Sequence, residues 1–329
     1  MINYFPISLN SLKTETIIGC DIYILMNVKG STRYVLYCKG DAVFGGGKKE
    51  QLIKKNVNRL FIRKNDEQKY YEYLETNFQD IISDKKIPSD EKAQIVHGTA
   101  TNLVKDVFND PRTGNIDRSK TFAYNMVDYI LKDEKAVHSL LKIATHEYYT
   151  YTHSVNVAAV GTSFVKNLGL GEEDMKSFCT GILLHDLGKT KISPDILNKK
   201  GKLTEEEFEQ IKKHPELGVE VLKETGNELK DVYTIVLQHH ENLDGSGYPY
   251  GLKRNEIHPC GKIARIIDIY DALTTNRSYS GAMRPFAALT EMKEKMLNCF
   301  EKELFKEFIC FLGPYDPRRK KRKKDILYT

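Results

Sequence analysis

The chain has 329 residues, of which 40% are hydrophobic and 29% are charged. This composition is typical of a folded protein with a sizeable core and excludes a disordered chain, and the length favours two domains. No apolar run approaches the ~20 residues that a membrane-spanning helix requires. Residues 1–12 lack the basic start and apolar stretch of a signal peptide. We therefore expect a cytoplasmic protein.

The positive charge of the chain is concentrated at one end. The net charge is +5, yet the run Arg318–Lys324 alone carries seven positive charges, which leaves −2 for the remainder. A nearly neutral body excludes a nucleic-acid surface over the whole protein, and we expect no DNA partner. The run itself predicts a solvated tail, and contact with an anionic membrane surface or a nucleic acid is the less favoured alternative.

The cysteines indicate a reducing compartment. All six are scattered along the chain and no two form a CxxC pair: Cys20, Cys38, Cys179, Cys260, Cys299 and Cys310. We interpret them as reduced core residues, which excludes a disulfide framework and makes a zinc–thiolate site an unfavoured interpretation.

Residues 1–85 predict a small α/β domain. Strands are expected at 17–28, 34–38 and 59–63. Gly45–Gly47 is interpreted as a turn before a short helix at 51–55, because no GKS or GKT follows to make a phosphate loop. A longer helix is predicted from a cap at Asn65 to Ile81. The sequence of this domain shows no group of residues typical of a catalytic site, so we interpret it as a regulatory or protein-interaction module.

From the polar break around Pro88 onwards the pattern is helical. We expect a helical linker region at 86–144, an all-helical domain at 145–312 and a flexible basic tail at 313–329. The fold is therefore predicted to be mainly α, with the small α/β domain in front.

Five histidines and two aspartates occupy apolar, inward-facing positions on successive predicted helices: His153, His185, Asp186, His214, His239, His240 and Asp268. His153 is predicted to precede a helix, His185 and the His239–His240 pair to end helices, and His214 to begin one. Burying so many polar groups costs several kcal/mol unless something satisfies them, and transition metals bind imidazole and carboxylate well.

A single histidine on an apolar face is more often a satisfied core residue than a metal ligand. An isolated His-Asp pair is likewise a weak signal. Five such features in one domain, beside the turn-rich segment 244–249, nevertheless favour a metal centre. Neighbouring residues on a helix lie about 100° apart, so His185 and Asp186 would address one ion from two sides, with Asp186 free to reach a second.

The sequence resembles the HD-GYP family, a branch of the HD phosphohydrolase superfamily, from about residue 145 to 312. The matching segments are HSVNV from His153, GILLHDLGK at 181–189, ILNKKGKLTEEE ending at Glu207, HPELG from His214, HHENLDGSGYP at 239–249 and ARIIDIYDALTTNRSY at 264–279. Their order and spacing both fit the family pattern.

The resemblance implies an all-helical HD-type domain that holds two or three metal ions, often iron or manganese. It implies hydrolysis of cyclic di-GMP, a bacterial second messenger, by a hydroxide that bridges two metals and attacks phosphorus. Carried over by position, one metal is held by His153, His185, Asp186 and Asp268. Asp186 bridges to a second metal, which is held by His214, His239 and His240. The separate roles of His239 and His240 stay open.

Three further residues match family residues near the substrate. Lys189 resembles the lysine beside the scissile phosphate, Arg277 resembles a phosphate-binding arginine, and Tyr248 belongs to the GYP loop. The resemblance thus makes Asp186 and Lys189 the catalytic candidates. The GYP loop and the N-terminal domain are the candidate contacts for protein partners.

Two departures from the family pattern affect these expectations. Trinuclear members carry a glutamate where this chain has Tyr149, so we predict two metals. Members commonly read RPYR or RPYK where this chain reads Arg277, Ser278, Tyr279 and Ser280. Losing one charged hydrogen bond costs ~1.5–3 kcal/mol, or roughly 10–150-fold in affinity. Because Ser280 replaces this cation, we expect weaker substrate binding or a different preferred dinucleotide.

Two other functions compete with the hydrolase. The missing cation at position 280 is compatible with a module that binds a cyclic dinucleotide and signals with weak or no turnover. A di-iron oxygenase is the third possibility, although Lys189 and Arg277 favour a phosphate ligand. Glu241, Asp244 and Asp271 are interpreted as supporting or turn residues rather than catalytic ones.

Overall fold

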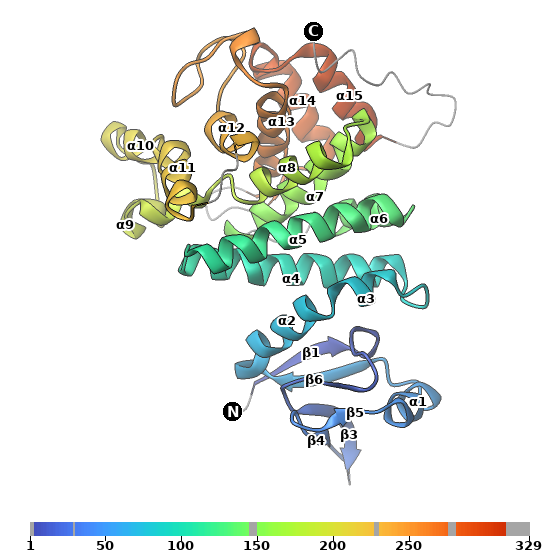
Figure 1. The fold of residues 1–329 in the computed structure, drawn as a ribbon. Helices are drawn as coiled ribbons and strands as arrows, with labels where there is room; N and C mark the ends of the chain where they lie inside the picture. The colour runs from blue at the N-terminus through green and yellow to red at the C-terminus, as the bar shows by residue number, and fades with distance from the viewer. Residues whose placement is uncertain (1–2, 29, 145–149, 227–229, 276–280, 314–329) are drawn as a thin grey trace. The chain divides into compact units, whose positions relative to one another are not determined.

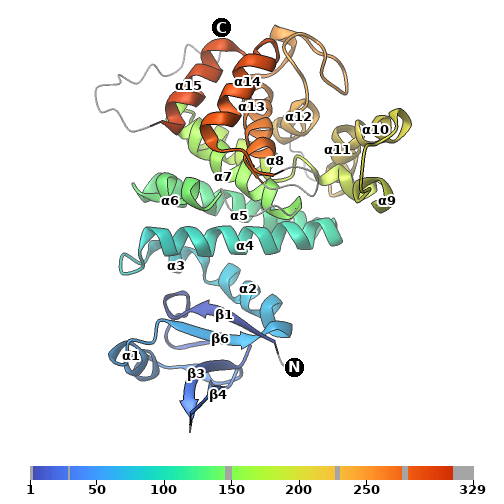
Figure 2. The ribbon, with the colours of Figure 1, turned by 180° about the vertical axis from the view of Figure 1, so that it is seen from behind.

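The computed structural model describes residues 3–28, 30–144, 150–226, 230–275 and 281–313. The chain consists of two compact units, Met1–Asn102 and Leu103–Thr329 (Figures 1 and 2). A small sheet in the first unit is followed by a helical second unit. The predicted fold class is therefore confirmed.

The first unit is built on a four-stranded antiparallel sheet with the strand order β1-β6-β3-β4. Its strands are β1 (Tyr4–Ser8), β3 (Ile22–Val28), β4 (Ser31–Cys38) and β6 (Arg59–Arg63), and β2 (Thr16–Ile17) pairs with β5 (Val43–Phe44). Its helices are α1 (Gly46–Lys54), α2 (Glu67–Thr76), α3 (Phe78–Ser83) and the start of α4 (Ser89–Asn109), with short 3-10 turns η1 (Leu9–Ser11) and η2 (Lys64–Asp66).

Alternation along β6 explains how this sheet acquires its core. Leu60 and Ile62 are fully buried, whereas Arg59 and Arg63 at the two ends are exposed. Successive strand residues point to opposite faces, so one face of β6 is apolar. Tyr70 and Leu74 of α2 belong to the same buried cluster.

Two local predictions for this unit were wrong, and one strand was not predicted. The expected helix from Asn65 to Ile81 is two helices, α2 and α3, separated at Asn77, and no side chain caps the start of α2. Gly46 and Gly47 lie inside α1 rather than in a turn. Strand β1 was not predicted because Pro6 weakens the strand pattern, and β1 is an edge strand, where proline is tolerated.

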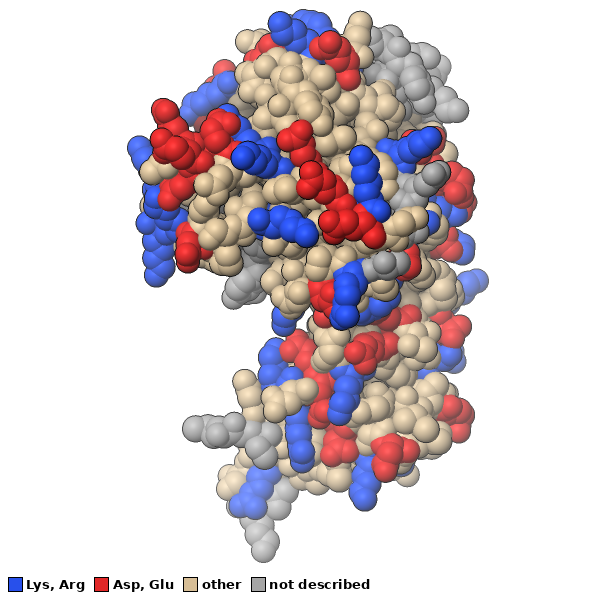
Figure 3. All heavy atoms as spheres, turned by 60° about the vertical axis from the view of Figure 1, so that its left-hand side comes forward, with Lys and Arg blue, Asp and Glu red and all other residues tan. Residues whose placement is uncertain are grey.

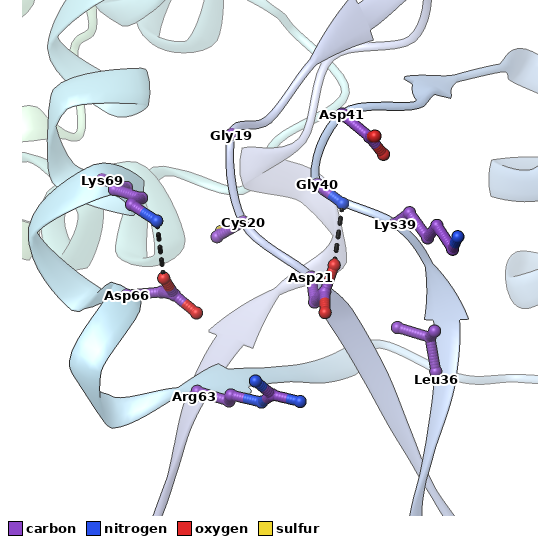
Figure 4. A pocket seen from close by; sticks show the side chains of 10 residues that line it. All are labelled: Gly19, Cys20, Asp21, Leu36, Lys39, Gly40, Asp41, Arg63, Asp66 and Lys69. Atoms are coloured by element: carbon purple, nitrogen blue, oxygen red, sulfur yellow. Dashed lines mark hydrogen bonds and ion pairs between the residues drawn. The ribbon is translucent and has the colours of Figure 1, made fainter.

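The first unit also contains a polar cavity of about 440 Å³ (Figure 4). Its lining residues are Gly19, Cys20, Asp21, Leu36, Lys39, Gly40, Asp41, Arg63, Asp66 and Lys69. Asp21 accepts a hydrogen bond from the backbone N–H of Gly40 at 3.0 Å, and Lys69 donates to Asp66 at 3.0 Å. Acidic and basic side chains are equal in number, so the charge of the lining favours neither an anion nor a cation.

Among its described residues, the second unit contains helices joined by loops and one isolated β-bridge between Asp244 and Lys253. Its helices are the end of α4, α5 (Thr113–Lys132), α6 (Ala136–Ile143), α7 (Thr150–Leu168), α8 (Glu172–Leu183), α9 (Pro194–Leu197), α10 (Glu205–Ile211), α11 (His214–Glu224), α12 (Lys230–Gln238), α13 (Pro259–Thr274), α14 (Pro285–Lys295) and α15 (Lys302–Leu312), with 3-10 turns η3 (Leu187–Lys191), η4 (Arg254–Glu256) and η5 (Leu297–Cys299). A capping box between Thr204 and Glu207 is present at the start of α10.

Four helices of this unit form a closed ring of contacts. α7 packs on α8, α8 on α12, α12 on α13, and α13 back on α7 (Figure 1). Helix α11 packs on α12 and on the turn η3 that follows α8. The ring brings the inner faces of segments far apart in sequence to one place.

The surface agrees with a nearly neutral body. On the face drawn in Figure 3, Lys and Arg side chains are interspersed with Asp and Glu. The basic run Arg318–Lys324 lies outside the described residues. Among the described helices, none has the length and apolar character needed to span a bilayer.

Gly188 allows η3 to approach α11 closely. A Cβ atom built on Gly188 would lie 1.9 Å from the carbonyl oxygen of His214 and 2.5 Å from the backbone nitrogen of Gly218. Both neighbours are backbone atoms that cannot rotate away, so only glycine fits this contact. The spacing between η3 and α11 therefore fixes the distance between Asp186 and His214.

We predict that Gly188→Ala lowers the free energy of unfolding by about 1–3 kcal/mol, the usual cost of overpacking. The matched control is Gly114→Ala on α5, where a Cβ meets nothing within 4 Å. Alanine also favours the helix there, so the control should not destabilise the protein. Urea denaturation of both variants measures the difference, and equal stability of the two would contradict this account of the contact.

Candidate metal centre

The ring of helices, together with α11, gathers the seven residues singled out by the sequence. His153 lies in α7, His185 and Asp186 between α8 and η3, His214 at the start of α11, His239 and His240 directly after α12, and Asp268 in α13. The prediction that His153 precedes its helix was wrong, because α7 begins three residues earlier at Thr150. The other helix-end placements agree with the prediction.

Asp186 lies between two groups of imidazoles. Its Oδ1 is 3.4 Å from Nε2 of His214 and 4.0 Å from Nε2 of His239. Its Oδ2 is 3.5 Å from Nε2 of His185 and 3.9 Å from Nε2 of His153. The carboxylate is 1% exposed, so these distances are set by packing rather than by solvent.

Two sets of side chains are close enough to hold a metal ion, and they share Asp186. His153, His185 and Asp186 make one set. The second set consists of Asp186, His214, His239 and His240. Asp268 borders the first set, with Oδ1 at 3.2 Å from Nε2 of His153. A shared carboxylate between two such sets is suited to two divalent ions.

Two buried polar atoms at the centre have no hydrogen-bond partner within the described residues. They are Oδ1 of Asp186 and Nε2 of His185. Leaving a buried polar atom without a partner costs free energy, and native proteins rarely do so without a reason. A divalent ion would satisfy both atoms, so the residues present fit a metal.

Backbone carbonyls orient three of the histidines. Nδ1 of His185 lies 2.6 Å from the oxygen of Ile182, and Nδ1 of His239 lies 2.7 Å from that of Val236. His214 makes the same contact with a carbonyl three residues earlier, at 2.8 Å. A carbonyl only accepts, so each Nδ1 carries the proton and each Nε2 keeps a lone pair for a metal.

Burial holds His185, His214 and His239 neutral. It lowers the pKa of His214 to about 4 and lowers the pKa of His239 and His185 as well. Burial alone would raise the pKa of Asp186, but Lys189 and the neighbouring histidines lower it well below its usual range. The centre therefore combines neutral imidazoles with an ionised carboxylate, the forms that bind metals.

His153 differs because two carboxylates face it. Burial alone would lower its pKa, but hydrogen bonds to Asp268 and Asp271 raise the pKa to about 9. Oδ2 of Asp271 lies 2.6 Å from Nδ1 of His153, so this carboxylate holds the Nδ1 proton. A metal that binds His153 must therefore displace the proton on Nε2. Asp271 thus positions His153, the supporting role expected from the sequence.

The expected substrate residues are described only in part. Lys189 Nζ lies 2.6 Å from Oδ2 of Asp186, and the ring of Tyr248 stacks on His240 with centroids 4.5 Å apart. Arg277, Ser278 and Ser280 lie outside the described residues, as does Tyr149.

The loop that carries Tyr248 is fixed by two acidic residues. Buried Glu241 accepts hydrogen bonds from the backbone N–H groups of Tyr250 and Leu252 at 2.8 and 2.9 Å. Asp244 accepts from the backbone N–H and the hydroxyl of Ser246. Both contacts lie within the loop, which agrees with supporting and turn roles.

Sequence reasoning missed Arg265 of α13. Its guanidinium donates to Oδ1 of Asn242 at 2.8 Å and lies 3.2 Å from Nδ1 of His240 and 3.7 Å from Oδ2 of Asp268. The available signal was its position three residues before Asp268, which places both on one helix face.

Comparisons with known proteins agree with this geometry. The family model described as "HD domain" matches residues 135–304. A cyclic di-GMP phosphodiesterase of Pseudomonas aeruginosa, PA4108, is 33% identical over 68% of this chain and 54% of its own length. A 3'3'-cGAMP-specific phosphodiesterase 1 of Vibrio cholerae is 38% identical over 41% of this chain and 31% of its own. The chain thus spans about half or less of the length of these relatives.

A solved structure shares the fold. It is Bd1817, a HDG"Y"P protein from Bdellovibrio bacteriovorus, which matches with a TM-score of 0.64 and 21% identity over 94% of this chain and 99% of its own. At this identity the likeness concerns the fold alone. The family model, however, matches the residues that contain the metal centre. The chain belongs to the HD-domain family.

Proposed function

We propose that this protein is a metal-dependent phosphodiesterase that hydrolyses cyclic di-GMP. The observation that carries the proposal is Asp186, a buried carboxylate whose two oxygens face two separate groups of imidazoles. Relatives named as cyclic di-GMP phosphodiesterases, from Pseudomonas aeruginosa and Thermotoga maritima among others, support the reaction and the substrate class.

Two divalent ions, iron or manganese, are proposed for the centre. His153, His185 and Asp268 would hold one ion and His214, His239 and His240 the other, with Asp186 shared between them. When bound, such ions lower the pKa of a shared water towards neutrality and neutralise charge on phosphoryl oxygens. The protein's part is to hold the imidazoles neutral, with Nε2 directed at the shared carboxylate.

Lys189 is proposed to contact the scissile phosphate. Its side chain is 24% exposed and its ammonium group lies 2.6 Å from Oδ2 of Asp186, so the residue is accessible from solvent while anchored beside the shared carboxylate. Hydrolysis adds water across one P–O bond, which leaves the phosphate on one ribose and a hydroxyl on the other. A fixed positive charge at Lys189 would stabilise the charge that develops on the phosphoryl oxygens during that step.

Tyr248 is proposed to contact the rest of the nucleotide. Burial raises the pKa of its hydroxyl, so the group stays a neutral donor. Its ring packs on His240 and has the ring of Phe208 edge-on at 6.4 Å. Because relatives from Vibrio cholerae are named as specific for 3'3'-cGAMP, the assay should compare both cyclic dinucleotides.

We predict that manganese stabilises the metal-free protein. A ligand at 100 times its dissociation constant adds about 2.7 kcal/mol to the free energy of unfolding. Asp186→Asn should abolish most of that gain because both ions lose a shared ligand. Asp195→Asn, an exposed aspartate on α9, should keep it. Thermal unfolding with and without Mn²⁺ measures the effect, and an equal gain in all three proteins would contradict a centre at Asp186.

We predict that the manganese- or iron(II)-loaded protein turns over cyclic di-GMP, and that Lys189→Ala lowers kcat/KM by roughly 10–150-fold, the range for one charged hydrogen bond. Lys191→Ala is the matched control, since that lysine is two residues away and half exposed. Chromatographic product analysis gives the rates.

Binding of the dinucleotide to metal-loaded protein without turnover would overturn the hydrolase and favour the signalling module. Turnover of 3'3'-cGAMP alone would keep the reaction and change the substrate.

A further inference from the structure

A series of ring contacts leads from the metal centre to a phenylalanine on the surface. The ring of Tyr248 lies against two imidazoles of the centre, with its centroid 4.5 Å from that of His240 and 6.2 Å from that of His214. A further neighbour of Tyr248 is Phe208 of α10, whose ring centroid is 6.4 Å away and whose plane is inclined by 79°. Phe208 is therefore two ring contacts away from the centre.

Phe208 is exposed to an extent that the other large rings of the helical core are not. Its exposed fraction is 44%, whereas Phe164, Phe178 and Phe305 are at most 2% exposed. An exposed ring forgoes the free energy that its burial would contribute. Nearly half of the surface of Phe208 is thus available to a ligand that approaches the centre from solvent.

The orientation of Phe208 is held by its own helix. A capping box between Thr204 and Glu207 anchors the backbone directly before it. One turn later, the ammonium group of Lys212 lies 5.0 Å from the ring centroid and is bonded to Glu209 at 2.6 Å. A ring that is already held in place loses little conformational entropy when a ligand stacks on it.

The charge of α10 decides which part of a dinucleotide suits this ring. The helix contains four glutamates and no lysine or arginine. Glu207 and Glu209 are paired with lysines, which leaves the exposed carboxylates of Glu205 and Glu206 to repel a phosphate. A nucleobase is neutral and has two flat faces, so it suits the ring of Phe208 where a phosphate does not.

We propose that Phe208 forms a nucleobase subsite, in which one base of the cyclic dinucleotide stacks on its ring while a phosphate lies at the metal centre. The inference rests on the proposed function and adds to it the residue that binds the base. Every base has a π face, so stacking contributes affinity whichever base is present. The subsite therefore holds the substrate and does not choose between cyclic di-GMP and 3'3'-cGAMP.

A fluorescent base measures the stacking directly and needs no turnover. The probe is a cyclic dinucleotide with 2-aminopurine in place of one guanine, since 2-aminopurine loses fluorescence when it stacks on an aromatic ring. On rapid mixing with the manganese-loaded protein we expect quenching, which Phe208→Tyr retains and Phe208→Leu loses. Leucine keeps an apolar side chain but has no π face, so lost quenching at unchanged thermal stability separates stacking from a structural role.

Substrate kinetics give the size of the effect. We expect Phe208→Ala to raise KM for cyclic di-GMP roughly 5–150-fold, the range for stacking one base on an aromatic side chain, with little change in kcat. Phe208→Tyr should keep the KM of the unaltered protein. Tyr124→Ala is the matched control, because Tyr124 of α5 is also a partly exposed ring beneath a lysine, Lys176, at 5.5 Å.

An unchanged KM in Phe208→Ala, or equal quenching by Phe208→Leu and the unaltered protein, would overturn the proposal. An equal rise of KM in Tyr124→Ala would also overturn it, because the effect would not be specific to this ring. Quenching without hydrolysis would support the subsite and contradict the proposed phosphodiesterase. If the unaltered, metal-loaded protein binds neither cyclic dinucleotide, the proposed function and the subsite both fail.

Discussion

The structure of the second unit depends on one buried carboxylate. Asp186 is almost fully enclosed and faces four imidazoles, with Lys189 on one oxygen and no hydrogen-bond partner for the other among the described residues. Such a group is costly to bury unless positive charge surrounds it. The four-helix ring, the close contact at Gly188 and the carbonyls that orient the histidines all hold that environment in place.

The clustered histidines also differ in the contacts that orient them and in their burial. Histidines whose Nδ1 donates to a carbonyl keep Nε2 free, and they are fully buried. His240 differs, because its Nδ1 lies 3.2 Å from Nη1 of Arg265 and its side chain is 15% exposed.

The sequence predicted the helical domain and the membership of the site because buried histidines on regular helices leave a clear pattern. It placed His153 outside α7, which begins at Thr150, and it joined α2 and α3 because apolar spacing continues through Asn77. Arg265 could not be assigned a role from sequence. Its importance arises from a contact with His240, 25 residues earlier, that only the packing of α13 beside α12 creates.

The central claim is that two ions share Asp186. The most direct test is anomalous diffraction from crystals of the manganese-loaded protein, collected near the manganese absorption edge. The account predicts two peaks on either side of Asp186, one nearest His153 and His185 and the other nearest His214 and His239. A single peak, or a peak that has no contact with Asp186, would contradict it.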